Sequence, residues 1–202
     1  MNIKKIFKKQ LSENINTHDK LTDLLPVIDT AIKVIYKKMQ KGGKLLLCGN
    51  GGSAADAQHL AAEYLVRLKP QTNRNPLPAI NLAQDISTIT ACGNDYSFDD
   101  IFLRTFQALS QKHDLLICFS TSGNSKNIIR VLKEAKKKKV FSICFLGGTG
   151  GHAKKFSNIS LIVESEITAR IQECHIFLGH FILEKVESML MLNKKFNKFF
   201  SR

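Results

Sequence analysis

Tryptophan, proline and paired cysteines are all scarce or missing in this sequence. It has no tryptophan and four prolines, too few for a proline-rich linker, and none of its five cysteines has the Cys-x-x-Cys spacing of zinc sites and redox motifs. Cys48, Cys118 and Cys144 lie inside apolar runs, so we expect buried, reduced thiols of a cytoplasmic protein. No apolar run approaches the roughly 18 residues of a membrane span, and the basic N-terminus lacks the apolar core of a signal peptide. These absences argue against a disulfide scaffold and a membrane-embedded chain.

Acidic residues are scarce too: 17 stand against 30 basic residues, which gives a formal net charge of +13. Nucleic-acid binding is one explanation, but arginine, the residue best suited to such contacts, makes up only six of the 30. Residues 42–129 carry seven basic and seven acidic side chains, so the excess lies in residues 1–41, in Arg130–Lys139 and after Leu192. Such runs are usually solvated helix faces or chain ends. We therefore expect neither a nucleic acid nor a membrane as partner.

The 202 residues, 44% of them hydrophobic, are enough for one domain with a sizeable core. Five short, continuous apolar runs indicate strands that are buried on both faces. They are Leu45–Cys48, Leu77–Leu82, Leu115–Ser120, Phe141–Leu146 and Ile159–Val163. Helical patterns separate and follow these runs, over 53–67, 86–110 (with a break), 124–139, 150–157 and 168–192. This alternation predicts an α/β fold, a three-layer αβα sandwich with a five-stranded parallel, flavodoxin-like sheet.

Two further helical patterns precede the first predicted strand. Apolar residues recur at helical spacing over 3–15 and over 21–40, and Gly42-Gly43 ends the second pattern. We therefore divide the chain into three parts. N-terminal helices at 1–41 pack on the domain or on another subunit, an α/β domain with a long final helix spans 42–192, and a basic tail follows at 193–202.

The first predicted strand ends in a glycine-rich loop, Cys-Gly-Asn-Gly-Gly-Ser at 48–53, that runs directly into a helix. Glycines let the backbone approach a ligand closely, and the free N–H groups at a helix start attract an anion. The loop also satisfies the Gly-x-Gly-x-x-Ala form of the dinucleotide fingerprint, so a nicotinamide dehydrogenase is one alternative. This fingerprint needs an acidic residue about 20 residues later, at the end of the next strand. The acidic residue found there is Asp85, which is too distant because it lies 36 residues after Gly49.

A second loop of this kind, Ser-Thr-Ser-Gly-Asn-Ser at 120–125, follows the third predicted strand and again opens a helix. Its hydroxyl groups, amide and glycine make a compact anion site, although an ordinary N-cap and turn is the alternative for this loop alone. Parallel strands end together at one edge of a sheet. Two such loops there favour a phosphorylated ligand, and a dinucleotide fold would not need the second one.

Ionisable residues follow the first loop. His59 and Glu63 are four residues apart, so they share one face of the helix that the glycine loop opens. An ordinary surface pair is the alternative for these two residues in isolation. A second group, Arg-Ile-Gln-Glu-Cys-His at 170–175, leads to His180 in the final helix.

Taken in order, these motifs resemble the sedoheptulose-7-phosphate isomerases of the SIS (sugar isomerase) family. The matching segments are C-G-N-G-G-S at 48–53, H-L-A-A-E at 59–63, G-N-D at 93–95, S-T-S-G-N-S at 120–125 and R-I-Q-E-C-H…H from 170 to 180. They cover nearly the whole chain. The resemblance implies an aldose–ketose isomerase that makes D-glycero-D-manno-heptose 7-phosphate for bacterial surface heptose, such as that of the lipopolysaccharide core.

The resemblance also implies roles for single residues. Glu63 and His180 would move a proton between C1 and C2 of the sugar through an enediol. The implied zinc ligands are His59, Glu63, Gln172 and His180. Zinc would polarise the carbonyl, but glutamine is an unusual ligand, so a metal-free acid–base pair is the alternative. The residues implied to bind the phosphate are Ser120, Thr121, Ser122 and Ser125, and Asn94 and Asp95 are implied to contact the sugar. The other residues implied to contact the substrate are Asn50, Gly51, Gly52, Ser53, Glu63 and Gln172.

The spacing of Gln172 and His180 leads to a further prediction. Eight residues of continuous helix correspond to roughly 12 Å of rise and about 80° of rotation, whereas the ligands of one ion must converge. We therefore predict that neighbouring subunits share the site, with one of these two residues supplied by a neighbour. Such sharing requires a symmetric oligomer, and the family resemblance implies a tetramer.

The alternative from another functional class is a non-enzymatic regulator on the same scaffold, which would bind a sugar phosphate or a replication-initiator protein. The basic surface suits such a regulator. The complete set of metal-type residues, with Glu63 and His180 both present, favours the enzyme.

Overall fold

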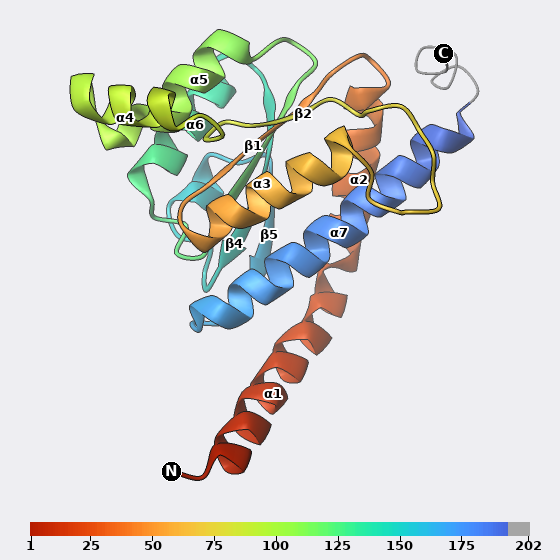
Figure 1. Ribbon diagram of the computed structural model, residues 1–202, viewed down its shortest axis with the longest axis vertical. Coiled ribbons are helices and arrows are strands. Elements are labelled where there is room, and N and C mark those ends of the chain that lie inside the picture. The colour runs from red at the N-terminus through yellow and green to blue at the C-terminus, as the bar shows by residue number, and fades with distance from the viewer. Residues whose placement is uncertain (194–202) are drawn as a thin grey trace.

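A computed structural model describes residues 1–193, and its centre is a five-stranded parallel sheet (Figure 1). The strands are β1 (Leu45–Gly49), β2 (Ala79–Asn81), β3 (Leu115–Ser120), β4 (Phe141–Gly147) and β5 (Ile159–Val163). Their order in the sheet is β2-β1-β3-β4-β5, which is the flavodoxin-like order. The predicted α/β fold is thus confirmed. The predicted basic tail lies outside the described residues except for Asn193.

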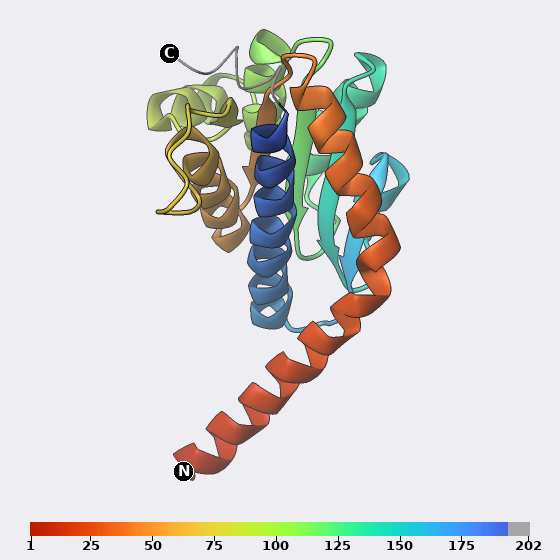
Figure 2. The same ribbon diagram turned by 90° about the vertical axis from the view of Figure 1, so that its right-hand side faces the viewer.

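Helices cover both faces of the sheet. The α-helices are α1 (Ile3–Asp19), α2 (Leu25–Met39), α3 (Gly52–Leu65), α4 (Ile86–Asp95), α5 (Ile101–Leu109), α6 (Lys126–Lys137) and α7 (Thr168–Leu192), and the 3-10 turns are η1 (Lys20–Leu24), η2 (Phe98–Asp100) and η3 (Ala153–Lys155). One face packs against α2, α3 and α7, and the other packs against α5 and α6 (Figure 2). Within residues 1–193, every helix is too short or too polar to cross a membrane.

Each central strand contributes to two hydrophobic clusters, because successive side chains of a strand point to opposite faces. In β1, Leu45 and Leu47 pack with α2, α3 and α7, whereas Leu46 and Cys48 pack with α5 and α6. Both clusters are closed to solvent, and this explains why the strand sequences are continuously apolar rather than alternating.

Three cysteines form a row across the middle of the sheet. Cys48, Cys118 and Cys144 occupy paired register positions of β1, β3 and β4. The Sγ atoms of Cys48 and Cys118 lie 3.5 Å apart. All five cysteines are buried as free thiols, as predicted.

Two predicted elements differ from the structure. The run Leu77–Leu82 pairs as a strand only over Ala79–Asn81. Its late start follows from Pro78, which has no N–H group to donate to the ladder. The predicted helix at 150–157 is only the 3-10 turn η3, because Gly150 has a φ of +87°, outside the helical region.

The first helix, α1, extends away from the sheet (Figures 1 and 2). All of its residues are described, and none of them is buried. Its exposed apolar residues are Ile3, Ile6, Phe7, Leu11 and Ile15. Its second half is tied to α7, where Asn14 donates to Glu173 (2.7 Å) and Arg170 donates to the carbonyl oxygen of Gln10 (2.9 Å). A contiguous exposed apolar face is typical of a surface that meets another chain.

His175 of α7 is a histidine held neutral inside the core. It packs against the rings of Phe119 and Phe145, and its Nε2 lies 3.1 Å from the carbonyl oxygen of Leu146, to which it donates. Its Nδ1 has no hydrogen-bond partner within residues 1–193. Burial lowers the pKa of His175 from 6.5 to about 4, although the Leu146 carbonyl acts in the opposite direction.

We expect His175 to make the protein sensitive to acid. The unfolded chain takes up this proton near pH 6.5 and the folded chain only near pH 4, so the free energy of unfolding falls as pH is lowered through this window. The loss is at most about 3.5 kcal/mol, because the shift from 6.5 to about 4 counts roughly 1.4 kcal/mol per pKa unit. Urea unfolding of the wild type and of His175→Asn at pH 7 and pH 4.5 measures it. The raised pKa of Asp56, about 6 because of burial, acts oppositely in both proteins; equal pH dependence in the two would contradict the prediction.

Candidate active site and metal centre

The loops that follow β3 and β4 interlock at the carboxyl edge of the sheet. A Cβ atom on Gly123 would lie 2.1 Å from the carbonyl oxygen of Gly150, so only glycine permits this approach. Asn124 Oδ1 accepts hydrogen bonds from the backbone N–H of His152 (3.0 Å) and from its Nδ1 (2.8 Å). The loop at 120–125 is therefore held in place by the loop that follows β4.

A cleft opens between these loops and the start of α7. Its lining includes Thr121, Ser122, Gly148, Thr149, Ser165 and Glu166. Two of the predicted phosphate residues, Thr121 and Ser122, thus lie in its wall. Ser120 is buried, and its Oγ accepts from the N–H of Gly123 (3.1 Å), so it shapes the loop. Ser125 stands at the N-cap of α6, where a helix start favours an anion.

The glycine-rich loop after β1 leads into α3 beside α7. Gly51 has a φ of +57° at the N-cap of α3, and a Cβ atom on Gly52 would lie 2.5 Å from Nε2 of Gln172. The side-chain amide of Asn50 exchanges two hydrogen bonds of 2.9 Å with the amide of Asn127 on α6. Ser53 is buried. The predicted contact residues of this loop therefore offer a ligand mainly their backbone N–H groups.

Three of the four predicted metal ligands converge between α3 and α7. His59 Nε2 lies 3.4 Å from Glu63 Oε1 and 2.9 Å from His180 Nε2, and one ligand atom of each residue lies within 4.8 Å of the others. Tetrahedral zinc with ligand bonds of about 2.0–2.1 Å places its ligand atoms roughly 3.3 Å apart. The nitrogen and oxygen donors suit a metal ion such as zinc, and the distance between His59 and Glu63 matches this spacing.

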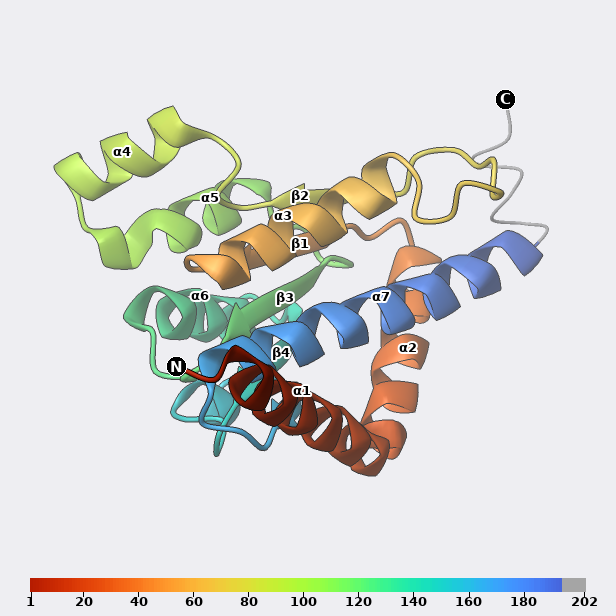
Figure 3. The same ribbon diagram turned by 60° about the horizontal axis from the view of Figure 1, so that its bottom comes forward.

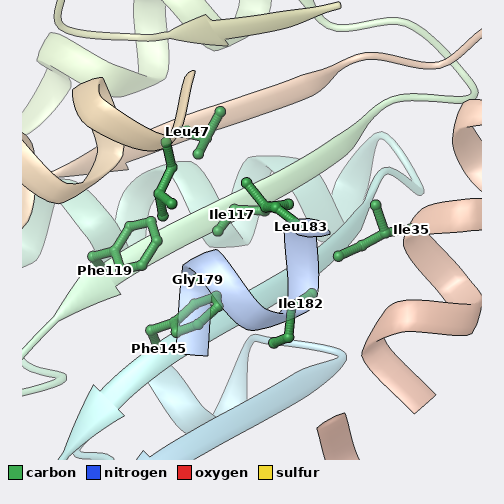
Figure 4. A pocket seen from close by; sticks show the side chains of 9 residues that line it. Ile35, Leu47, Ile117, Phe119, Phe145, Gly179, Ile182 and Leu183 are labelled. Carbon is green, nitrogen blue, oxygen red and sulfur yellow. The ribbon is translucent and has the colours of Figure 1, made fainter. Parts of the chain in front are cut away.

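Close packing of α7 on α3 brings these residues together. A Cβ atom on Gly179 would lie 2.5 Å from Cδ1 of Leu60. Gly179 faces a small apolar cavity between α7 and the sheet, among side chains that include Ile117 and Phe145 (Figure 4). The absence of a side chain at Gly179 thus lets the next residue, His180, reach His59.

The surroundings of His180 favour its neutral form. Burial lowers the pKa of His180, the neighbouring His59 lowers it further, and the carboxylate of Glu63 acts in the opposite direction. At neutral pH its ring nitrogen is therefore able to bind a metal or accept a proton. The 2.9 Å approach of the two Nε2 atoms requires either a hydrogen on one nitrogen or a cation bound by both.

The remaining predicted site residues lie elsewhere. Gln172 contacts Gly52, which precedes His59 by seven residues, a distance of roughly 10 Å along α3. Asn94 and Asp95 are exposed at the end of α4, where the amide of Asn94 donates to Asp95 (2.8 Å). Figures 1 and 3 both place α4 apart from α7.

Comparison with known proteins gives the family. The SIS domain family model matches residues 10–147. Over 185 residues, which are 92% of this chain and 97% of the relative, the sequence is 45% identical to the phosphoheptose isomerase of Campylobacter concisus. The chain belongs to the phosphoheptose isomerases of the SIS domain family. The phosphoheptose isomerase of Clostridium acetobutylicum is 40% identical over 195 residues, 95% of this chain and 98% of that protein.

Two solved phosphoheptose isomerases have the same fold. The structure from Neisseria gonorrhoeae has a TM-score of 0.86 and 35% identity, and that from Francisella tularensis has a TM-score of 0.88 and 33% identity. In both comparisons, 93% of this chain and all of the other chain are covered. The phosphoheptose isomerase family therefore accounts for nearly the whole chain.

Several residues of the site were not foreseen from the sequence. Thr149 and Ser165 line the cleft, and Asn127 orients Asn50. The run Gly-Gly-Thr-Gly-Gly at 147–151, directly after a strand, is a signal that would have indicated Thr149. Asp85, the displaced acid of the dinucleotide fingerprint, is the N-cap of α4, where its carboxylate accepts from two backbone N–H groups.

Proposed function

We propose that the protein is an aldose–ketose isomerase that converts sedoheptulose 7-phosphate to D-glycero-D-manno-heptose 7-phosphate in bacterial heptose biosynthesis, in the cytoplasm. The family assignment supports the reaction class. The observation that carries the proposal is the cluster of His59, Glu63 and His180 on the helices beside the hydroxyl-lined cleft. A regulator that only binds a sugar phosphate would need the cleft but not this cluster.

The residues divide into a binding group and a proton-transfer group. Thr121, Ser122 and Ser125 hold the phosphate at the N-terminus of α6, where backbone N–H groups and the helix dipole favour an anion. Glu63 takes a proton from C1 of the ketose and returns it to C2 of the enediol. His180, neutral at pH 7, moves the proton between the two oxygens.

Zinc is the proposed cofactor, held by His59, Glu63 and His180. When bound, it supplies a Lewis acid that polarises the carbonyl and stabilises the oxygen anion of the enediolate. Glu63 has two carboxylate oxygens, and Oε1 is the one that faces His59. Its other oxygen remains for proton transfer. In His180, Nε2 is the nitrogen that faces His59, so Nδ1 remains to exchange a proton with the sugar oxygens.

The direct test of this function is a zinc-dependent turnover assay with sedoheptulose 7-phosphate and detection of the aldose product. We expect a strong chelator to lower kcat at least tenfold and added zinc to restore it, because the ion stabilises the developing negative charge. An unchanged rate after verified zinc removal would contradict the role of zinc and favour the metal-free acid–base pair. Absence of turnover in the zinc-loaded wild type would favour the regulator.

We also propose that the complete site is shared between subunits of a homo-oligomer, a tetramer by family resemblance. The separation of Gln172 from His180 supports this, since α7 carries Gln172 to the start of α3 and His180 to its middle. The exposed apolar face of α1 is a surface through which copies of the chain would associate. Asn94 and Asp95, exposed on α4, would then face the site of a neighbour.

Mixing two inactive variants tests the shared site. We expect Gln172→Ala and His180→Ala each to be nearly inactive, and randomly mixed oligomers of the two to regain about a quarter of the wild-type rate, because that fraction of shared sites contains both native residues. Co-expression with two affinity tags yields the mixed oligomers. Oligomers of Gln172→Ala carrying both tags are the control, and mixed oligomers no more active than this control would contradict sharing.

A further inference from the structure

Arg74 lies in the loop between α3 and β2, and its guanidinium reaches both helices of the candidate site. Nη2 donates to the carbonyl oxygen of Glu63 (2.9 Å), and Nη1 donates to those of Tyr64 (2.9 Å) and Asn75 (3.0 Å). Nε donates to the carboxylate of Glu187 on α7. The side chains of Arg74 and Glu187 are 1% and 2% exposed, so this ion pair is shielded from water.

The carbonyl groups of Glu63 and Tyr64 belong to the last turn of α3. Carbonyls at a helix C-terminus have no intrahelical donors, and a positive charge there is favourable. Arg74 therefore fixes the turn that carries Glu63. Because Glu187 binds the same guanidinium, this turn is also fixed against α7, which carries His180.

Stability alone is a weak explanation for such a pair. Burying an ion pair removes the hydration of both charges, and apolar residues of similar volume often replace it without loss of stability. Apolar residues cannot, however, supply directed bonds to carbonyl oxygens. The planar guanidinium has five donors in a fixed geometry, and Arg74 directs them to α3, to its own loop and to α7.

We propose that Arg74 is a positioning residue, which acts through backbone contacts to hold Glu63 in register with His180 for proton transfer. The proposal rests on the roles proposed above for Glu63 and His180. Arg74 itself does not touch the carboxylate of Glu63; it bonds to the backbone of that residue.

The same loop offers a matched control. Lys69 Nζ lies 2.7 Å from Glu184 Oε1, so this ion pair also joins the loop to α7. Its side chains are 39% and 35% exposed, and the bond described for Lys69 goes to α7 rather than to the end of α3. Replacing Lys69 removes an ion pair between this loop and α7 but leaves the hydrogen bonds of Arg74 to the last turn of α3 intact.

The experiment compares Arg74→Lys, the double variant Arg74→Met/Glu187→Leu, and Lys69→Met. The double variant removes both buried charges together, so we expect it to melt within a few degrees of the wild type. We expect both Arg74 variants to lose about 10–100-fold in kcat with less than about threefold change in KM, because a shift of about 1 Å is enough for such a loss. We expect zinc affinity, measured by chelator competition, to fall about tenfold. Lys69→Met should match the wild type in all three measurements.

Several results would overturn the proposal. One is a folded double variant with kcat and zinc affinity within twofold of the wild type. Another is an equal loss of kcat in Lys69→Met. If neither Arg74 variant melts cooperatively, the pair belongs to folding and the positioning role is wrong. If Glu63→Gln retains the wild-type rate, the proposed role of Glu63 as the base is wrong, whatever Arg74 does. The positioning by Arg74 is then still tested by zinc affinity, and unchanged zinc affinity in the Arg74 variants would refute it.

Discussion

Glu63→Gln should lower kcat by about 10²–10⁴-fold, the usual contribution of a well-placed proton-transfer group. The amide keeps the shape of the side chain but cannot take a proton from C1. Glu63 is only partly buried, so we expect an amide of the same size to leave the core and the helix unchanged. Steady-state kinetics with sedoheptulose 7-phosphate measures the loss, and circular dichroism verifies the fold.

The matched control for Glu63→Gln is Glu184→Gln. Glu184 lies on α7 one turn after His180 and forms the partly exposed ion pair with Lys69. The chemical change is the same and the position is close, yet Glu184 is not part of the metal cluster, so we expect kcat within about twofold of the wild type because exposed ion pairs contribute little. Zinc content is measured in both variants, because a loss of metal alone would also lower the rate. A zinc-loaded Glu63→Gln enzyme with near wild-type kcat would refute the role of Glu63 as the base.

Gly179→Ala should have the next largest effect, although the substitution adds only one methyl group outside the cluster. The new Cβ atom would lie 2.5 Å from Cδ1 of Leu60, so α7 must move away from α3 or the leucine must change rotamer. Inserting a methyl group into a packed core costs about 1–3 kcal/mol, and moving His180 by about 1 Å is expected to lower kcat about 10²-fold. Thermal melting and kinetics of the variant measure the two effects.

A second substitution distinguishes packing from a direct effect of the methyl group. Gly179→Ala/Leu60→Ala removes the leucine side chain that the new Cβ atom would meet. We expect the double variant to recover most of the kcat lost in Gly179→Ala, while it remains less stable than the wild type because Leu60 is buried. Failure to recover any activity would show that the approach of α7 to α3 is not what positions His180.

The sequence was sufficient to predict the fold because its signals are local. Each strand is a short apolar run, and the turns after β1 and β3 have the glycines and hydroxyl residues that a strand-to-helix connection needs. The errors are local as well. Pro78 delays the start of β2, and the positive φ of Gly150 prevents the helix predicted over 150–157.

The candidate site could be predicted only in part, because its geometry depends on contacts distant in sequence. The i, i+4 spacing brings His59 next to Glu63, but the approach of His180 depends on Gly179 packing against Leu60. Arg74 could not be predicted from its loop, which has no periodicity, since its partner Glu187 is 113 residues away. The division of the chain at residue 41 and the individual substrate contacts remain predictions.

The row of cysteines across β1, β3 and β4 can serve as an internal probe of how often the protein opens. Burial raises the pKa of the Cys118 thiol well above its usual value, and contacts with Cys144 and Cys48 raise it further, so the reactive thiolate is suppressed in the native protein. Reagents can modify these sulfur atoms only after the sheet between its two helical layers has opened. The time course of labelling in native buffer therefore records how often the centre of each molecule is exposed to solvent, without any denaturant.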